Sequence, residues 1–439
     1  MGLFFGTDGL RGKVNKDLTQ DIAYKIGNAL SILKEKPTII IGADTRISNS
    51  YLALSLAGGA MSGGANVIDA GVVPTAGVAF LTRTLKADYG VVISASHNSG
   101  EYNGIKVFSG EGYKLSDKEE ELIERCFIKN KINDFPNIGT YKQDFNLIKL
   151  YRDYLIKTSE NSLKGKTIVL DGAFGAAHRI APEVFRKLGA KVIAANCVNN
   201  GLKINENCGA LYPENLRSKV FRYKADMGFA FDGDADRLIA VDEKGNIIDG
   251  DKIICGIAKY LKKLGKLNKN TAVGTSHTNM AIEEELKNCG IDFIRTDIGD
   301  KYVLAKLIEK GLSIGGEQSG HVILKDYATT GDGILTAIFV ANMIINEKST
   351  LSETLNFDLY PQSNKNVIVE DKFRIMNSEE LIKAITKYNG ELEGKGRLMI
   401  RASGTEPKVR VMVESKDKDD NERIATAMVE LIKKIDGNS

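Results

Sequence analysis

Short apolar runs, each followed by a segment with helical periodicity, recur along most of the chain. In the first region this alternation predicts strand, helix, strand, helix and strand, over Thr38–Gly42, Tyr51–Met61, Ala65–Ala70, Thr75–Leu85 and Tyr89–Ile93. Parallel strands need crossover connections, and helices between strands supply them. The region therefore reads as a doubly wound unit of mixed α/β structure.

The same alternation begins again twice. The second pass comprises a strand, a helix, a strand and an apolar run, at Thr167–Asp171, Ile180–Leu188, Lys191–Ala195 and Met227–Phe231. The third comprises a strand, a helix, a strand and a further strand, at Thr271–Gly274, Met280–Lys287, near Phe293, and at Leu312–Gly315. The repetition predicts three units of one architecture.

The end of the chain has a different pattern. From about Gln362 we expect three strands and a closing helix, at Asn366–Val369, Arg397–Ile400, Val409–Val413 and Ile424–Ile435. The polar segment Lys114–Phe145 is expected to be helical with turns and to bridge the first two predicted domains. The fold class is therefore α/β, with three consecutive doubly wound mixed α/β domains and a smaller C-terminal α+β domain. The predicted boundaries are 1–150, 151–250, 251–362 and 363–439.

Each of the three passes ends in a polar loop just beyond a strand. The loops are Ser94–Asn98, Asp232–Arg237 and Gly315–His321. In open α/β sheets ligands collect at the carboxyl ends of strands. The three loops could therefore converge on one cleft.

Composition excludes several classes of function. The 439 residues carry 60 Lys and Arg against 57 Asp and Glu, a formal charge of +3, which indicates neither a nucleic-acid footprint nor an acidic tail. Five scattered cysteines, without CxxC spacing, argue against a disulfide framework or a zinc cluster and favour a reducing cytoplasm. We therefore expect a cytoplasmic protein with no nucleic-acid partner and no membrane association, and a small anionic ligand fits this balance of charge.

Asp232, Asp234 and Asp236 stand at alternate positions immediately after an apolar run. Carboxylates so close together repel unless a cation lies among them, so the triplet predicts a site for a hard divalent ion. A calcium-binding EF-hand is excluded because Arg237 stands where that loop requires Gly. A solvated acidic turn is the alternative, and the flanking apolar residues argue against it.

Ser96 lies beside His97 in the first polar loop. Adjacent side chains on an extended segment point to opposite faces, so His97 is expected to be poorly placed as a base for Ser96. No G-x-S-x-G motif surrounds the serine, which argues against a serine hydrolase. A long polar turn is predicted to return to Lys106, a cation that could neutralise a phosphoryl group.

Two further segments mix cations, hydroxyl groups and glycines in a way suited to holding a phosphate. They are Gly6–Gly12, which contains Arg11, and Arg401–Pro407, with Arg410 beyond it. Neither matches the Walker A or the dinucleotide-binding motif, and a plain glycine turn is the alternative for each. Glu317 and Ser319 could grip sugar hydroxyls, with a helix cap as the alternative.

Together these residues resemble the α-D-phosphohexomutase superfamily. The resemblance spans nearly the whole chain and rests on four motifs in the same order, Gly6–Gly12, Ser94–Asn98, Asp232–Arg237 and Arg401–Pro407. Within the superfamily, the segments that favour the bacterial branch acting on glucosamine phosphates are Gly315–His321, Asn207–Gly209, Thr329–Gly333 and Gly404–Met412. Members that act on mannose or glucose phosphates usually carry Met where Gln318 stands.

The resemblance implies a heart-shaped, four-domain enzyme with a central cleft, either a monomer or a homodimer. It would interconvert glucosamine 6-phosphate and glucosamine 1-phosphate, on the route to UDP-N-acetylglucosamine and cell-wall precursors, through phosphorylated Ser96 and glucosamine 1,6-bisphosphate. One Mg²⁺ per active site would be held by Ser96, Asp232, Asp234 and Asp236. By the same likeness Arg11 and Arg237 would lie near the transferred group, Lys106 and His321 would be acid and base, and Glu317 and Ser319 would grip the sugar. The non-reacting phosphate would be bound by Arg401, Ser403, Gly404, Thr405 and Arg410.

The chain departs from the family pattern at three places. Ser99-Gly100 follows Asn98 where the family commonly has Pro, which predicts a looser turn around Ser96. Lys301 stands where Arg is common, and Thr275–Asn279 replaces a segment that usually contains Met-Ser-Asn. The last two bear on the choice of sugar.

Three alternative functions stay open at this point. The same scaffold could act mainly on glucose or mannose phosphates. The metal loop could instead activate a water molecule in a metal-dependent sugar phosphatase, or the chain could be a non-catalytic sensor of sugar phosphates.

Overall fold

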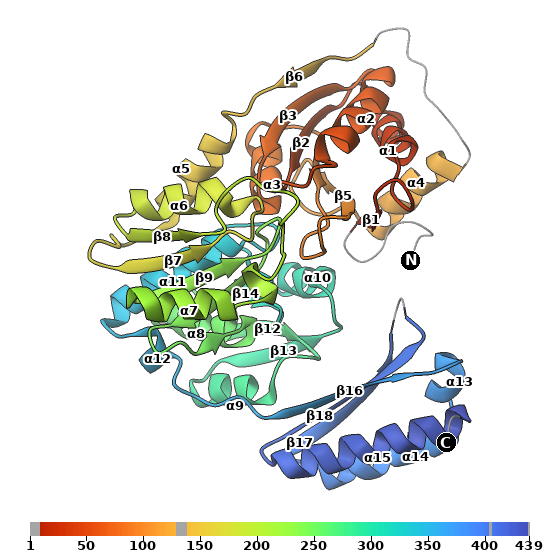
Figure 1. The fold of residues 1–439 in the computed structure, drawn as a ribbon, viewed down its shortest axis with the longest axis vertical. Helices are drawn as coiled ribbons and strands as arrows, with labels where there is room; N and C mark the ends of the chain where they lie inside the picture. The colour runs from red at the N-terminus through yellow and green to blue at the C-terminus, as the bar shows by residue number, and fades with distance from the viewer. Residues whose placement is uncertain (1–8, 129–137, 404–405, 438–439) are drawn as a thin grey trace. The chain divides into compact units, whose positions relative to one another are not determined.

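The computed structural model describes residues 9–128, 138–403 and 406–437 of the chain. They form two compact units (Figure 1). Unit 1 comprises Met1–His277 and Cys289–Asn356, and unit 2 comprises Thr278–Asn288 and Phe357–Ser439. Within the described ranges, no helix has the length and apolar character needed to cross a membrane.

The first sheet of unit 1 has six strands in the order β1-β5-β4-β2-β3-β6. Their bounds are β1 (Leu10–Lys13), β2 (Thr38–Ala43), β3 (Asn66–Val72), β4 (Tyr89–Ile93), β5 (Tyr102–Ser109) and β6 (Tyr141–Gln143). The helices of this region are α1 (Gln20–Leu33), α2 (Asn49–Ser62), α3 (Thr75–Thr84) and α4 (Asp117–Ile128). Along β2, Ile39 and Ile41 pack in one core with α1 and α2, whereas Ile40 packs in another with α3. This alternation confirms the predicted doubly wound unit.

One prediction for this region is wrong and another is incomplete. The residues around Lys106 form the buried strand β5, not a polar turn, because their polar groups find partners: Asn103 donates to Ser48 and Asn49, at 2.8 and 2.7 Å. The segment Lys114–Phe145 contains α4 as expected but also β6, which pairs in parallel with β3. This segment therefore completes the first sheet before the chain continues into the second.

The second and third sheets of unit 1 confirm the predicted repetition. The second has the order β11-β10-β9-β7-β8, with β7 (Thr167–Asp171), β8 (Lys191–Ala195), β9 (Met227–Phe231), β10 (Leu238–Asp242) and β11 (Ile247–Ile248). The third has the order β13-β12-β14-β15, with β12 (Thr271–Thr275), β13 (Asp292–Thr296), β14 (Ile314–Gly316) and β15 (Val322–Leu324). Their helices are α5 (Ile148–Thr158), α6 (Ala177–Lys187), α7 (Glu214–Tyr223), α8 (Gly250–Lys263), α10 (Asp300–Lys310), α11 (Gly333–Glu347) and α12 (Leu351–Thr354), and two short 3₁₀ helices span Gly209–Leu211 and Asn268–Asn270.

Unit 2 contains an antiparallel three-stranded sheet in the order β16-β18-β17. The strands are β16 (Gln362–Ile368), β17 (Gly396–Ala402) and β18 (Lys408–Ser415), and the helices are α9 (Met280–Asn288), α13 (Lys372–Met376), α14 (Glu379–Glu391) and α15 (Lys418–Asp436). Residues four apart on α15, including Ile424 and Met428, form one core with Val411 and Val413 of β18. The expected α+β module is confirmed, while the four domain boundaries stay predictions.

Helices α1 and α2 approach each other closely at glycines. Gly59 of α2 offers a test of this packing. A Cβ added at Gly59 would lie 1.9 Å from the backbone oxygen of Tyr24, whereas one at neighbouring Gly58 would lie 4.0 Å from the nearest atom of Tyr24. We expect Gly59→Ala to lower the free energy of unfolding by about 1–3 kcal/mol, because the helices must separate. Gly58→Ala is the matched control and should leave it unchanged or slightly higher, since Ala favours helix. Equal effects in urea unfolding would contradict this packing.

Candidate active site

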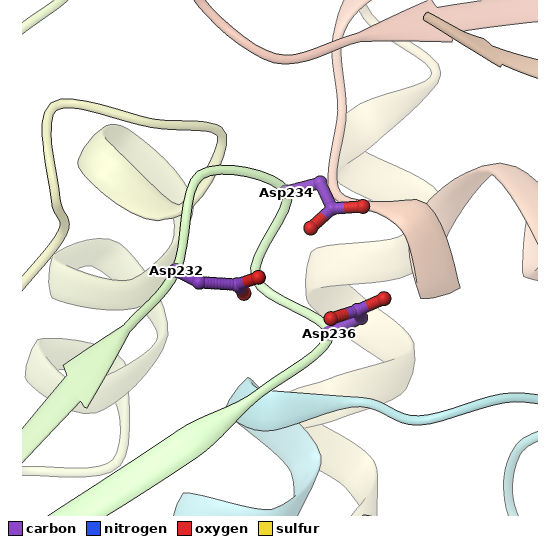
Figure 2. A group of neighbouring side chains, drawn as sticks. All are labelled: Asp232, Asp234 and Asp236. Carbon is purple, nitrogen blue, oxygen red and sulfur yellow. The ribbon is translucent and has the colours of Figure 1, made fainter. Parts of the chain in front are cut away.

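The acidic loop between β9 and β10 brings three carboxylates together (Figure 2). Asp232, Asp234 and Asp236 are all buried, and one ligand atom from each lies within 4.8 Å of the others. The turn is tight: Ala235 has φ 59° and donates its N–H to the backbone oxygen of Asp232 at 3.1 Å. The burial of all three side chains rules out a solvated acidic turn.

Cationic and hydroxyl groups surround this triplet. Lys106 Nζ lies 2.9 Å from Asp234 Oδ2 and 3.3 Å from Asp236 Oδ2. Thr75 donates its hydroxyl to Asp234 Oδ2 at 2.7 Å, and the backbone N–H of Arg237 donates to Asp232 Oδ1 at 3.2 Å.

Burial and mutual repulsion act on the three carboxylates. Burial, together with Asp236 and Asp234, raises the pKa of Asp232 well above its usual range. Asp234 Oδ1 is buried and has no hydrogen-bond partner among the described residues. Buried oxygen ligands of this kind suit a hard divalent cation, so the three carboxylates could hold one.

Ser96 reaches this triplet from the loop that follows β4. Its hydroxyl donates to Asp232 Oδ2 at 2.6 Å, and the residue is only 1% exposed. The structure thus brings together the serine and the acidic loop that the sequence analysis singled out separately.

The expectation for His97 is wrong. Ser96 has φ 49°, in the left-handed region, so the two side chains are not on opposite faces of an extended segment. Ser96 Oγ lies 3.3 Å from His97 Nδ1. Burial and the nearby charges of Arg237 and Arg11 lower the pKa of His97 to about 4, so the ring is neutral at neutral pH.

His321 also approaches Asp236. Its Nδ1 is 3.6 Å from Asp236 Oδ2, its Nε2 is 3.5 Å from Asp300 Oδ2, and its backbone pairs with that of Arg237 in an isolated bridge. Burial alone would lower the pKa of His321, but Asp236 and Asp300 raise it to about 9. Lys106 and His321 therefore both contact Asp236.

Three other predicted residues of unit 1 have clear positions. Arg11 lies on β1 opposite Gly104 of β5. Glu317 follows β14, is half-buried, and accepts a hydrogen bond from the backbone N–H of Gly299 at 3.1 Å. Ser319 is exposed two residues further along the same loop.

The predicted phosphate-binding residues belong to unit 2. Arg401 and Arg410 are directly opposite each other on β17 and β18. Burial and the charge of Arg410 lower the pKa of Arg401. A bound anion would offset both effects and stabilise the charged guanidinium group. Ser403 is buried, and its backbone oxygen accepts a hydrogen bond from Lys372 Nζ at 2.6 Å. Gly404 and Thr405 lie outside the described residues.

Several polar residues that the motifs do not indicate also contact the site or its loops. Thr75 binds Asp234, and Arg46 and Asn205 contact the backbone of the Ser96 loop. Arg46 lies three residues beyond the end of β2, so the rule that found the other loops, polar residues just beyond a strand, also applies to it. No comparable sequence signal points to Asn205.

Comparison with known proteins decides the family. Models of the four domains of phosphoglucomutase/phosphomannomutase match residues 2–134, 149–245, 249–360 and 365–431. The chain belongs to this family. It is therefore a phosphohexomutase, an enzyme of the isomerase class.

Individual relatives are similar over their full lengths. The chain is 46% identical to the phosphoglucosamine mutase of Carboxydothermus hydrogenoformans, over 99% of this chain and 100% of that protein. It is also 46% identical to the phosphoglucosamine mutase of Alkaliphilus oremlandii, over 98% and 99% of the two chains.

Solved structures of lower identity share the fold. A phosphoglucomutase/phosphomannomutase family protein of Burkholderia thailandensis superimposes with a TM-score of 0.82 at 23% identity, over 98% of this chain and 97% of that one. The N-acetylphosphoglucosamine mutase of Aspergillus fumigatus gives 0.69 at 17% identity, over 99% and 95%. The fold class of the family is thus confirmed for this chain.

The acidic triplet predicts a response to metal. We expect Mg²⁺ to raise the melting temperature of the protein in a concentration-dependent way, because a ligand that binds only the folded state stabilises it. Asp236→Asn should abolish this shift. Asp242→Asn is the matched control and should retain the shift. It changes a buried carboxylate at the end of β10, which accepts hydrogen bonds from the backbone N–H groups of Lys244 and Asn246 in its own turn. An equal Mg²⁺ shift in Asp236→Asn and the unaltered protein, measured by scanning calorimetry, would contradict the assignment.

Proposed function

We propose that the chain interconverts glucosamine 6-phosphate and glucosamine 1-phosphate, through a phosphoserine at Ser96 and glucosamine 1,6-bisphosphate. The observation that carries this proposal is the 2.6 Å contact between the Ser96 hydroxyl and Asp232 of the buried acidic loop. The choice of sugar is supported by the relatives named phosphoglucosamine mutase, at 46% identity over nearly the whole chain.

Ser96, Asp232, Asp234 and Asp236 would hold one Mg²⁺. When bound, this ion supplies positive charge that stabilises the phosphoryl oxygens as charge develops on them. The charge of the three carboxylates and the unpartnered Asp234 Oδ1 support this assignment. Lys106 and Arg237 contribute positive charge from the protein itself.

The reaction consists of two phosphoryl transfers. In the first, the bond between phosphorus and Ser96 Oγ breaks and a bond forms to the 1-hydroxyl oxygen of the 6-phosphate sugar. That hydroxyl gives up its proton to a base, and Ser96 Oγ receives one. In the second, Ser96 Oγ gives up its proton to a base and forms a bond to the phosphorus at position 6. The bond between that phosphorus and the sugar oxygen breaks, and an acid protonates the oxygen. We assign the acid and base roles to Lys106 and His321, which both contact Asp236.

The bisphosphate must turn around between the two transfers, so one site must accept the sugar in both orientations. We propose that Glu317 and Ser319 bind sugar hydroxyls and that Arg11 lies near the transferred group. Arg401, Ser403, Gly404, Thr405 and Arg410 are the proposed phosphate-binding set. The opposite positions of Arg401 and Arg410 on neighbouring strands, with the charge of Arg410 lowering the pKa of Arg401, support this role, because two nearby like charges favour a bound anion.

We also propose a cytoplasmic location. All five cysteines, Cys126, Cys197, Cys208, Cys255 and Cys289, lie in the described part of the chain and are free. Free thiols, two of them buried, suit a reducing compartment.

Replacing Ser96 separates a mutase from a metal-dependent phosphatase. We expect Ser96→Ala to lower mutase kcat by on the order of 10⁴-fold or more, because the group that carries the phosphoryl is gone. Ser99→Ala, an exposed serine of the same loop, is the control and should keep its activity. A phosphatase that uses a water nucleophile would survive the first change, so sustained phosphate release by Ser96→Ala would overturn the proposal.

A second assay tests the sugar. We expect kcat/KM for glucosamine 6-phosphate to exceed that for glucose 6-phosphate and mannose 6-phosphate by about tenfold or more. A site built to pair with a 2-amino group leaves its polar groups less well paired when a 2-hydroxyl stands there instead. Turnover is measured in a coupled assay for the 1-phosphates. A preference for glucose or mannose phosphate would overturn the proposed choice of sugar. The proposal that the chain is a phosphoserine-dependent mutase would stand.

A further inference from the structure

Ser96 has a backbone conformation that L-residues with a side chain rarely adopt. Its φ of 49° lies in the left-handed region, where such a residue persists only if its surroundings hold it. This conformation aims the hydroxyl at Asp232, at 2.6 Å. Whatever holds the backbone of Ser96 therefore also sets the position of its Oγ.

A single guanidinium group gathers the carbonyl groups of this loop. Arg46 Nη2 donates to the backbone oxygens of Ser96, at 3.1 Å, and Asn98, at 2.7 Å. Its Nη1 donates to those of Ser99 and, at 2.9 Å, Tyr102. One rigid, planar cation thus binds three carbonyl groups of the loop and a fourth at the start of β5.

Arg46 is itself held in place. Its side chain is 0% exposed, and its Nε donates to Asp44 Oδ2 at 2.9 Å. The same carboxylate oxygen accepts the hydroxyl of Ser94 at 2.5 Å, and Ser94 Oγ accepts the backbone N–H of Ser96 at 2.9 Å. Asp44 therefore supports the Ser96 loop through both Arg46 and Ser94.

A second side chain approaches the same carbonyl groups from the region of the second sheet. Asn205 Nδ2 donates to the backbone oxygens of Ser96, at 2.8 Å, and Asn98, at 3.0 Å. A Cβ added at Gly233, within the acidic loop, would lie 2.5 Å from the Ser96 oxygen and 3.0 Å from Asn205 Nδ2. The acidic loop, Asn205 and the Ser96 loop are thus packed in direct contact.

We propose that Arg46 and Asn205 are positioning residues that hold Ser96 in its left-handed conformation and so set its hydroxyl against the acidic loop. This inference rests on the proposed role of Ser96 as the phosphoserine.

The test compares two asparagines of the same region. Asn196, like Asn205, has a left-handed backbone, with φ 50° against 60°, and donates its amide within 3.0 Å, but to Asp171 and not to the Ser96 loop. Unaltered protein, Asn205→Ala and Asn196→Ala are each dephosphorylated and then incubated with glucosamine 1,6-bisphosphate. Intact mass follows phosphate uptake on Ser96, and kcat, KM and melting temperature are measured alongside.

We expect Asn205→Ala to slow phosphate uptake and to lower kcat by on the order of 10- to 100-fold with little change in KM, because a misplaced nucleophile affects the reaction more than binding. Asn196→Ala should retain kcat even if its melting temperature falls equally. Arg46→Lys keeps the charge beside Asp44 but loses the planar fork, and should show the same defect in kcat as Asn205→Ala.

Each result is decisive. If Asn205→Ala takes up phosphate and turns over as fast as Asn196→Ala while the unaltered protein is phosphorylated on Ser96, the inference is overturned and the proposed function stands. If the unaltered protein takes up no phosphate on Ser96, the proposed function fails and the inference fails with it. Should Arg46→Lys not fold, the pair of asparagine variants still decides.

Discussion

Mutual repulsion of Asp232, Asp234 and Asp236 is the constraint on which the rest of the site depends. All three carboxylates are buried within 4.8 Å of one another, which disfavours ionisation and raises the pKa of Asp232. Lys106, itself buried on β5, offsets part of this charge. Such an arrangement costs free energy of folding, so it is expected where the charge serves a function, here the holding of a cation beside a phosphoryl group.

The repeated fold explains how this constraint meets a nucleophile. Ser96 and the acidic loop each follow the carboxyl end of a strand, β4 in the first sheet and β9 in the second. When the two sheets pack together, the carboxyl ends of β4 and β9 can lie close to each other. The hydrogen bond between Ser96 and Asp232 shows that they do. The third sheet contributes His321 in the same way, from the loop between β14 and β15.

Sequence patterns predicted the parallel strands and the polar loops at their ends, because burial on both faces leaves apolar runs that local reading detects. The same patterns failed where a polar residue is buried because it pairs with a residue far away in the sequence. Lys106 reads as part of a polar turn because Asp234 lies far away in the sequence. Strand β6 could not be predicted because it is only three residues long, is largely exposed, and has no apolar run. The left-handed conformation of Ser96 depends on Arg46 and Asn205, which bind its backbone oxygen from distant positions in the sequence. The residues next to Ser96 in the sequence therefore do not indicate it.

The central claim is that the Ser96 hydroxyl and the three carboxylates form one cation site. Crystals soaked in Mn²⁺, a stand-in for Mg²⁺ with anomalous scattering, test it most directly. The account predicts one anomalous peak in contact with Ser96 Oγ and with oxygens of Asp232, Asp234 and Asp236. A fully occupied peak elsewhere, or one bound by the carboxylates with the Ser96 oxygen out of reach, would contradict it.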